Sequence, residues 1–265
     1  MTAAMIDICF NFTHTSFRGD EEAVLQRAVD AGVERMIVTG SRIEESRECL
    51  ALAQQYPEQL WSTAGIHPHR AREWDAQSAD AIRDLAGHEK TVAIGECGLD
   101  YNRNFSTRQQ QLYAFEAQLE LAAECRLPAF MHERDAHDDF VRLVERYRSD
   151  LQAAVIHCFT GNKHQLQAYL ELDLHIGITG WICDERRGHH LHHFIDIVPD
   201  ERLMIETDAP YLLPRDLSPK PRDRRNEPAY LPHIRDTVAR LRGASPDELA
   251  ATTTQNAERF FGLPQ

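Results

Sequence analysis

Four residues that could bind a metal each end a short apolar run of the chain. Glu96 follows TVAIG, His132 follows PAFM, His157 follows AAVI, and Asp208 closes RLMIETD. Imidazole and carboxylate groups are the ligands that divalent metals take in hydrolytic sites. If the four runs are strands of one parallel sheet, these groups open onto the same edge, and we expect a metal-dependent hydrolase.

The rest of the chain alternates between short apolar runs and longer helical patterns. We expect eight strands, over 5–11, 34–39, 60–66, 91–96, 128–132, 153–158, 174–179 and 202–208. Helices are expected over 20–32, 44–56, 75–87, 108–126, 137–149, 163–172, 188–197, 233–242 and 246–261. Near-continuous apolar strands are typical of a parallel sheet that is covered on both faces. Eight β/α units in about 250 residues favour an α/β TIM (β/α)8 barrel that forms a single domain over 1–265, with a doubly wound open sheet as the alternative.

A barrel would gather the chemistry at the carboxyl ends of its strands. Side chains alternate along a strand, so we expect Glu96 to share the inward face of Ile94, and the two histidines to continue inward faces in the same way. The predicted strand ends carry Asn11, His67, Glu96, His132, His157 and Asp208.

Glu206 lies two residues before Asp208, so both carboxylates would face inward on a strand. Such a pair repels unless one member binds a metal and the other is paired or protonated. We expect Asp208 to be a metal ligand or general base. Glu206 then either orients a histidine or a water molecule, or makes a purely structural hydrogen bond.

Several further residues near these ends could contact a substrate. His67 is a candidate for binding a phosphate or protonating a leaving group, whereas His69 is expected to face solvent in a turn fixed by Pro68. Arg134 could clamp a phosphate bidentately, or instead pair with a nearby aspartate. Trp181 and Tyr101 could stack on unpaired bases or simply pack at the rim. The HHLHH run at 189–193 falls in a predicted helix and is expected to be a solvated face rather than a metal site.

The charge of the chain argues against a protein that passively coats nucleic acid. Its 29 basic and 42 acidic residues give a net charge of −13, so no global basic field attracts phosphates. The segment PRDLSPKPRDRRNEP (214–228) is a local exception, with five basic and three acidic residues. It could contact the backbone of a strand, or be a solvated loop.

The chain is expected to be a cytosolic monomer. Its start, MTAAMIDICF, has no signal-peptide pattern, and no run approaches the roughly 20 apolar residues that span a bilayer. The six cysteines show no CxxC pairing, so we expect reduced thiols.

Several motifs of the sequence resemble the TatD-type metal-dependent deoxyribonucleases. The matching segments, in the order of that family, are AGIHPH (64–69), AIGECGLD (93–100), FMHERDA (130–136), HCFTG (157–161), ETDAPYL (206–212) and RNEP (225–228). The resemblance implies a TIM barrel, a divalent metal that is most often Mg²⁺, and hydrolysis of phosphodiester bonds. NRNFS (102–106) and GITGWICDERRG (177–188) resemble a branch of the family for which 3′→5′ exonuclease action on single-stranded DNA and RNA, and a role in DNA repair, are implied.

The first predicted strand departs from the pattern of this family. Typical members read D-x-H-x-H there, and the two histidines bind one metal. Here Cys9 and Asn11 occupy those positions, after Asp7. A second metal site, held by Asp208 with Asn11, is therefore expected to be weak at most, and Cys9 is expected to be a small core thiol rather than a ligand.

The sequence thus predicts one firm metal site formed by Glu96, His132 and His157. The metal would lower the pKa of a bound water, and Asp208 would accept its proton. Two histidine ligands would also suit Mn²⁺ or Zn²⁺. The candidate catalytic residues are Asp208, Glu96 and His67, and the candidate substrate-binding residues are Arg103, Arg134, Arg225 and Asn226. The alternatives are a hydrolase of the same barrel that acts on an ester or amide, and a non-catalytic barrel that binds nucleic acid or a protein.

Overall fold

The protein has an eight-stranded parallel sheet whose strands follow one another in chain order. The computed structural model describes residues 4–264. The strands are β1 (Met5–Phe10), β2 (Val33–Val38), β3 (Leu60–Ala64), β4 (Thr91–Asp100), β5 (Ala129–Arg134), β6 (Ala154–Ile156), β7 (His175–Ile178) and β8 (Leu203–Ile205). A parallel bridge from Phe10 to Ala209 joins β1 to the segment after β8. This order is that of a TIM barrel, so the predicted fold class is confirmed and the open sheet is not found.

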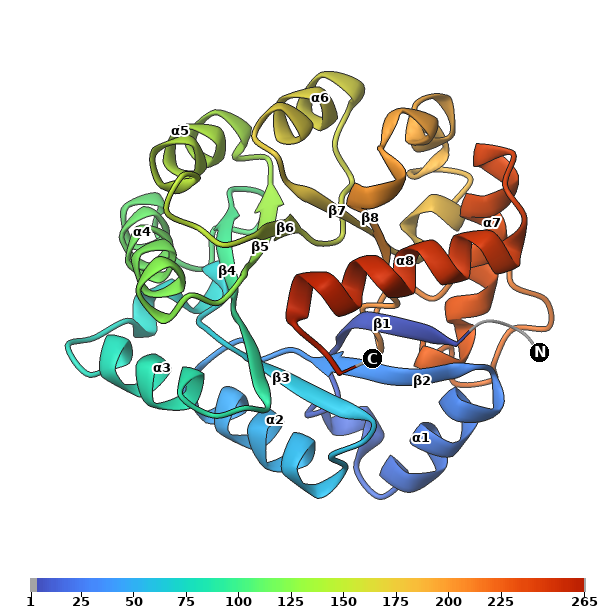
Figure 1. Ribbon diagram of the computed structural model, residues 1–265, viewed down its shortest axis with the longest axis horizontal. Coiled ribbons are helices and arrows are strands. Elements are labelled where there is room, and N and C mark those ends of the chain that lie inside the picture. Colours follow the sequence, from blue (N-terminus) through green and yellow to red (C-terminus); the bar gives the residue numbers. More distant parts are fainter. Residues whose placement is uncertain (1–3, 265) are drawn as a thin grey trace. The chain divides into compact units, whose positions relative to one another are not determined.

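Helices alternate with the strands, as Figure 1 shows. They are α1 (Glu21–Asp30), α2 (Ile43–Gln55), α3 (Ser78–Ala86), α4 (Arg108–Cys125), α5 (His137–Tyr147), α6 (Lys163–Glu171), α7 (Leu231–Arg242) and α8 (Pro246–Phe261). Short 3-10 helices lie at Thr15–Phe17, Pro68–Glu73, Gly180–Cys183, Asp200–Arg202 and Pro228–Tyr230. Among the residues described, no helix is both long and apolar enough to cross a membrane.

The predicted helix over 188–197 is wrong. The segment forms two short 3-10 helices, His189–His193 and Ile195–Ile197, which meet at Phe194. Leu191 and Phe194 are both buried, and residues three apart lie on one side of a 3-10 helix. His189 and His193 are exposed, as expected for a solvated face, whereas His190 and His192 are half-buried and approach the carbonyl oxygens of Gly161 and Ile182 at 3.0 and 2.8 Å.

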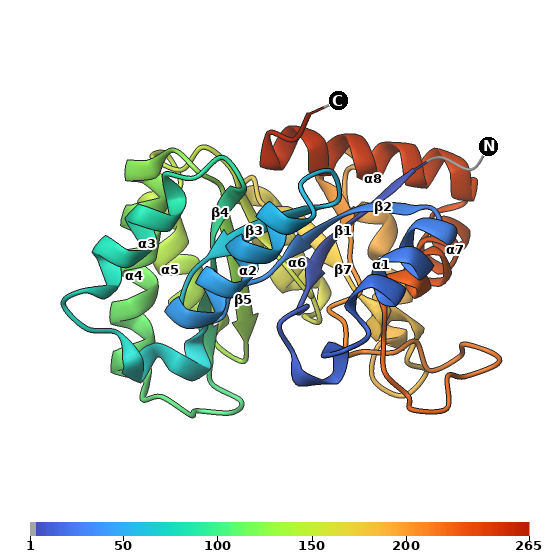
Figure 2. The same ribbon diagram turned by 90° about the horizontal axis from the view of Figure 1, so that it is seen from below.

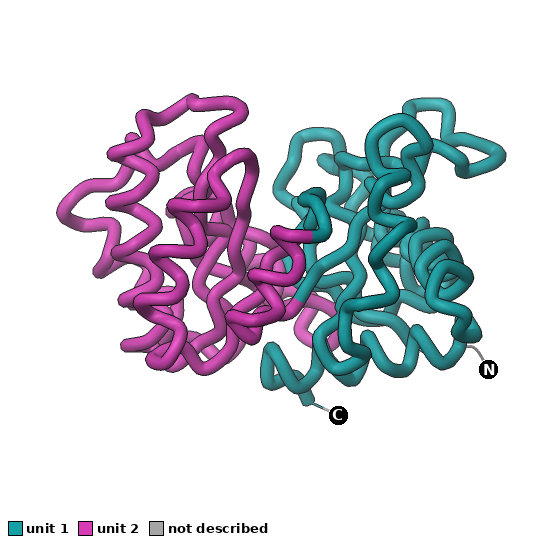
Figure 3. The backbone as a smooth tube through the Cα atoms, turned by 90° about the horizontal axis from the view of Figure 1, so that it is seen from above, with its two compact units in different colours: residues 1–38, 158–163, 176–265 teal, residues 39–157, 164–175 magenta. Residues whose placement is uncertain are grey.

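The chain divides into two compact units, which Figure 3 distinguishes by colour. Unit 1 comprises residues 1–38, 158–163 and 176–265, and unit 2 comprises 39–157 and 164–175. The single domain over 1–265 stays a prediction. Because the candidate site residues fall into both units, each group is described within its own unit.

Helix α4 is the element of unit 2 that supports the loops of its candidate site. Its start is fixed by a capping box, in which Thr107 accepts from the Gln110 backbone and the Gln110 side chain accepts from the Thr107 backbone. Phe115 of α4 stacks on Phe140 of α5, with ring centroids 5.5 Å apart, and the two helices lie side by side in Figures 1 and 2. Helix α4 also contacts β4 and the turn after β3.

In unit 1, α8 packs on the first and last strands. It begins with the capping box of Ser245 and Glu248 and ends at Gly262, whose φ of +64° suits a residue without a side chain. Asn256 is buried, and its amide donates to the carbonyls of Asp200 and Leu203 at 2.6 and 2.8 Å. The start of β8, and hence the segment that carries Asp208, is fixed by these bonds.

Candidate metal centre and the Asp208 loop

Three imidazole rings converge on one carboxylate oxygen in unit 2. Glu96 Oε1 lies 2.7 Å from His157 Nε2, 3.1 Å from His132 Nδ1 and 3.2 Å from His67 Nε2. Glu96 is only 6% exposed, so this contact is shielded from water. The structure therefore brings together four residues that the sequence places on three strand ends and one loop. We call them, with His69 and Asp100, the histidine cluster.

Strand β4 carries Glu96 in its interior rather than at its end. The strand continues to Asp100, and its pairing with β5 shifts register between Ile94 and Cys97. The expected alternation between Ile94 and Glu96 is therefore wrong, because a bulge interrupts the period of two. The bulge needs Gly95, whose φ is +144° and where a Cβ atom would lie 2.1 Å from the carbonyl oxygen of Phe130.

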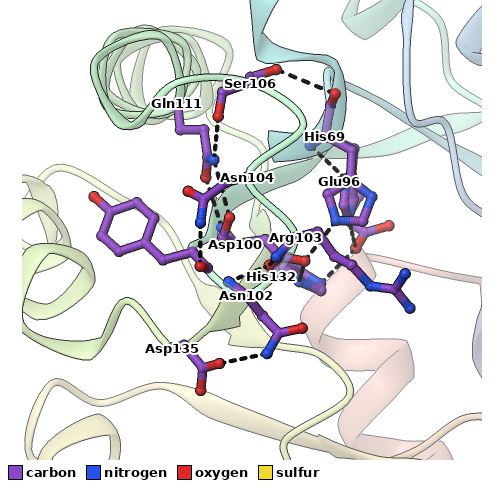
Figure 4. Close-up of polar contacts among 12 residues, drawn as sticks. His69, Glu96, Asp100, Asn102, Arg103, Asn104, Ser106, Gln111, His132 and Asp135 are labelled. Carbon is purple, nitrogen blue, oxygen red and sulfur yellow. Dashed lines mark hydrogen bonds and ion pairs between the residues drawn. The ribbon is translucent and has the colours of Figure 1, made fainter.

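The extension of β4 adds Asp100 to the cluster, as Figure 4 shows. Asp100 Oδ2 lies 2.6 Å from His69 Nε2 and 3.6 Å from His132 Nε2. The expectation that His69 faces solvent is wrong, because its ring is held by this buried carboxylate. Asp100 ends AIGECGLD, and a strand four residues longer than expected would have identified it from the sequence.

The electrostatics of the cluster favour the charged forms of Glu96 and His132 and the neutral form of His67. Burial opposes ionisation of Glu96, but the nearby His157 and His67 outweigh it and hold its pKa well below the usual value. Burial would lower the pKa of His132, but the nearby carboxylates of Asp100 and Glu96 raise it to about 9. Burial lowers the pKa of His67 to about 4. A metal that takes a nitrogen of His132 must therefore displace a proton.

The donor set of the cluster fits a divalent metal. One ligand atom each from His67, Glu96 and His132 lie within 4.8 Å of one another. His132 Nε2 is buried and has no hydrogen-bond partner among residues 4–264. Imidazole nitrogens combined with a carboxylate oxygen suit Zn²⁺ and Mn²⁺. Mg²⁺ prefers oxygen ligands, so of this set the carboxylate suits it best.

Two buried glutamines of α4 hold the loops that present the cluster. Gln118 accepts from the Ile66 N–H at 2.7 Å and donates to the Ile66 carbonyl at 3.0 Å, just before His67. Gln111 makes the same pair of bonds with the backbone of Asp100, at 2.8 and 3.0 Å. The two glutamines are seven residues apart, so they lie on one face of the helix. Sequence reasoning missed them, although two glutamines on the buried face of a predicted helix were visible.

In unit 1, Asp208 lies in a loop rather than on the last strand. Strand β8 ends at Ile205, and Asp208 has a φ of +53°. The expectation that Glu206 and Asp208 share a strand face is therefore wrong. We call residues 207–211 the Asp208 loop. The N–H of Asp208 donates to the carbonyl of Cys9 at 3.0 Å, which ties the loop to the end of β1.

Asn11 and Cys9 both contact the Asp208 carboxylate. Asn11 Nδ2 donates to Asp208 Oδ1 at 2.8 Å, and Cys9 Sγ lies 3.6 Å from the same oxygen. The two positions where histidines were expected from the family pattern thus present an amide and a thiol to Asp208. An amide N–H can donate a hydrogen bond but offers no lone pair to a metal.

Two further carboxylates of unit 1 are buried beside this loop. Asp7 accepts from the backbone and the hydroxyl of Thr207, yet burial raises its pKa to about 7. Glu206 accepts a hydrogen bond from the backbone N–H of Cys158, the residue after His157. This bond is structural, and the alternative that Glu206 orients a histidine stays a prediction.

The predicted substrate-binding residues differ in how the structure uses them. Asn226 is fully buried, and its amide donates to the carbonyls of Thr207 and Tyr211 at 2.9 and 2.7 Å. It braces the Asp208 loop through these bonds, and its contact with substrate stays a prediction. Arg225 is paired with Asp20 and Glu227, so its guanidinium serves a structural network.

Of the other candidates for substrate contact, some pack against neighbouring side chains and some are exposed to solvent. Trp181 is 8% exposed and lies under the Arg187 guanidinium, at 4.3 Å from its ring centroid, which favours packing over base stacking. The Tyr101 hydroxyl donates to Asp139 at 2.7 Å. Arg103 is exposed, and Arg134 ends β5, so substrate contact by these two residues stays a prediction.

Comparisons with known proteins agree with this fold. The family model described as "TatD related DNase" matches residues 6–262. The "3'-5' ssDNA/RNA exonuclease TatD" of Citrobacter rodentium is 55% identical over 259 residues, which cover 98% of each chain. The protein of the same name from Salmonella typhimurium is 54% identical over 257 residues, covering 97% of this chain and 98% of its own. The crystal structure of YJJV, a TatD homologue from Escherichia coli, has a TM-score of 0.89 and 31% identity, with all of both chains covered. The protein therefore belongs to the TatD related DNase family.

Proposed function

We propose that the protein is a metal-dependent exonuclease that hydrolyses single-stranded DNA and RNA from the 3′ end. The observation that carries the proposal is the convergence of three imidazoles on Glu96 Oε1 in a shielded site. Relatives above half identity that are named 3'-5' ssDNA/RNA exonucleases support the reaction and the substrate. A role in DNA repair, a monomeric state and a cytosolic location stay predictions of the sequence.

The histidine cluster supplies the residues that would hold the metal. We assign Glu96, His132 and His157 as its ligands. When bound there, a divalent metal lowers the pKa of a coordinated water and neutralises charge on a phosphate oxygen. Asp100 orients His132 through its buried carboxylate, a partner of the kind that commonly fixes metal-binding histidines.

Asp208 is proposed to accept the proton of the attacking water. It follows β8, whereas the cluster residues lie in the second half of strands β4 and β5 or just after β3 and β6. The support for this role is that parallel strands of a barrel share their carboxyl end. Asn11 and Cys9 orient the carboxylate through its Oδ1 oxygen, which keeps a base in a defined position. Any metal contact of Asp208 is expected to be weak, because Asn11 and Cys9 replace the histidine pair. His67, which contacts Glu96, is assigned to the substrate phosphate.

The reaction is tested with oligonucleotides labelled at either end. Purified protein is incubated with 3′- and 5′-labelled single-stranded DNA and RNA, with Mg²⁺, Mn²⁺, Zn²⁺ or EDTA. We expect metal-dependent shortening from the 3′ end, which Asp208→Ala loses and the exposed control Asp196→Ala keeps. Intact oligonucleotides together with cleavage of a small ester or amide would instead identify a hydrolase of another bond.

A further inference from the structure

The loop between β4 and α4 presents an exposed aromatic ring beside the histidine cluster. Phe105 is 54% exposed, and among the described residues only Tyr113 and Tyr211 are comparably exposed large apolar side chains. The Phe105 ring meets the His69 ring edge to face, with centroids 4.9 Å apart and an interplanar angle of 86°. His69 in turn contacts Asp100 of the cluster. An apolar ring at this place is therefore both open to water and close to the proposed chemistry.

Hydrogen bonds on both sides of Phe105 fix the loop that carries it. Asp100 Oδ1 accepts from the backbone N–H groups of Asn102 and Arg103, at 2.9 and 2.8 Å. Ser106 is buried, donates to the His69 carbonyl at 3.2 Å, and its own carbonyl accepts from Gln111 at 3.0 Å. Figure 4 shows these bonds on both sides of the loop. A surface that is fixed before binding loses less conformational entropy when a ligand arrives.

Arg103 adds a positive charge to the same loop. Its side chain is exposed, and within residues 4–264 its guanidinium makes no hydrogen bond or ion pair; it has no dashed contact in Figure 4. Arg225, by contrast, is paired with the carboxylates of Asp20 and Glu227. An arginine without a carboxylate partner in a chain of net charge −13 is available to a phosphate.

We propose that residues 101–107 form a nucleotide platform, on which Phe105 stacks against the unpaired base next to the bond that is cut and Arg103 contacts a backbone phosphate. The inference rests on the proposed nuclease function and names the element that binds its substrate. The edge contact with His69 leaves a face of the Phe105 ring open to a base. Stacking of this kind accepts any base, because every base has a π face.

The platform is tested by comparing ends that carry a base with ends that do not. Single-stranded oligonucleotides ending in a normal nucleotide or in a tetrahydrofuran abasic nucleotide are bound to the protein in EDTA and followed by fluorescence anisotropy. We expect the wild type to prefer the base-bearing end by roughly 5- to 150-fold, the range for one base stacked on an aromatic residue. Phe105→Ala should lose this preference, and Phe105→Trp should keep it.

A matched control removes an exposed aromatic from elsewhere in the same unit. Tyr113→Ala, on α4, should leave the preference unchanged. Arg103→Gln should weaken the binding of both oligonucleotides alike. It should also reduce the slope of the logarithm of the binding constant against the logarithm of the salt concentration by about 0.7, the value for one phosphate contact with a single strand. The platform is overturned if Phe105→Ala weakens the binding of both oligonucleotides equally, or if the wild type does not prefer the base-bearing end.

The binding assay separates this inference from the proposed reaction. A base preference that depends on Phe105 supports the platform even if no phosphodiester bond is cut when metal is restored. Cleavage from the 3′ end with the same efficiency on both ends, before and after Phe105→Ala, supports the nuclease and overturns the platform. Circular dichroism and the melting temperature of each variant establish that the fold is retained.

Discussion

The histidine cluster of unit 2 and the Asp208 loop of unit 1 surround their central carboxylates with different chemistry. Glu96 meets three imidazole rings, whereas Asp208 meets the amide of Asn11 and the thiol of Cys9. An imidazole can lose its proton and give a lone pair to a metal, while an amide N–H can only donate. This difference supports the proposal that the metal binds in the histidine cluster and that Asp208 acts as an oriented base.

Both groups are nevertheless braced in the same way. Gln111 and Gln118 hold the loops of the histidine cluster, and Asn226 holds the Asp208 loop, each through a buried side-chain amide that pairs with backbone. A buried amide satisfies backbone groups that no strand or helix pairs. The loops of both regions are therefore held by the same kind of hydrogen bond. The regions differ in the residues that face the central carboxylate.

The largest effect is expected from neutralising the centre of the histidine cluster. Glu96→Gln keeps the size of the side chain but removes the charge that three imidazoles share. Metal content after dialysis should fall to background, and nuclease activity should drop by more than the roughly 10- to 100-fold that loss of a ligand's partner costs. The exposed control Glu89→Gln should behave as the wild type. Full activity of Glu96→Gln would show that the metal lies elsewhere.

Removing the carboxylate of the Asp208 loop should separate chemistry from metal binding. Asp208→Ala is expected to lower kcat by about 10²- to 10⁴-fold, the contribution of a positioned proton acceptor. The metal affinity of the histidine cluster should stay within a few-fold of the wild type, as measured by calorimetry. A parallel loss of metal and activity would assign Asp208 to the metal itself.

Asp7 should make the stability of unit 1 depend on pH. Its pKa is about 7 in the folded protein and near 3.8 in an unfolded chain. Between these values the folded state binds more protons, so the free energy of unfolding should fall as pH rises, by roughly 1 kcal/mol per pH unit. Asp7→Asn should flatten this dependence and raise stability at pH 8 relative to the wild type. Denaturant melts from pH 4 to 8 measure it, and an unchanged slope would contradict the assignment.

The smallest effect is expected from the brace of the Asp208 loop. Asn226→Ala leaves the carbonyls of Thr207 and Tyr211 without their amide donor. The free energy of unfolding should fall by about 1–3 kcal/mol, and kcat should fall less than in Asp208→Ala while metal content is kept. Gln111→Ala is the matched change in unit 2, and there metal affinity should weaken instead. If both variants bound metal with the same affinity, the proposed difference between the two regions would be contradicted.

The sequence predicts the parts of the site that follow from a regular strand and misses those that depend on its interruption. His132 lies in β5 and His157 directly follows β6, and both contact Glu96, as the apolar pattern of these strands predicts. Asp100 and the true position of Asp208 were missed, because a bulge lengthens β4 and β8 ends early. No periodicity reveals either feature.

Hydrogen bonds between residues far apart in the sequence are not predictable from its pattern either. Asn11 and Asp208 are 197 positions apart, and Asn226 meets a carbonyl 19 positions away. A buried asparagine or glutamine looks in sequence like any polar loop or helix residue. Its role is set by which backbone groups the fold leaves without partners.

The position of the metal tests the account most directly. Crystals grown with Mn²⁺ would give an anomalous difference map at the manganese absorption edge. We expect one strong peak bounded by Glu96, His132 and His157, and at most a weak one beside Asn11. Two peaks of equal height, or a single peak held by Asp208 and Cys9 without the histidines, would contradict it.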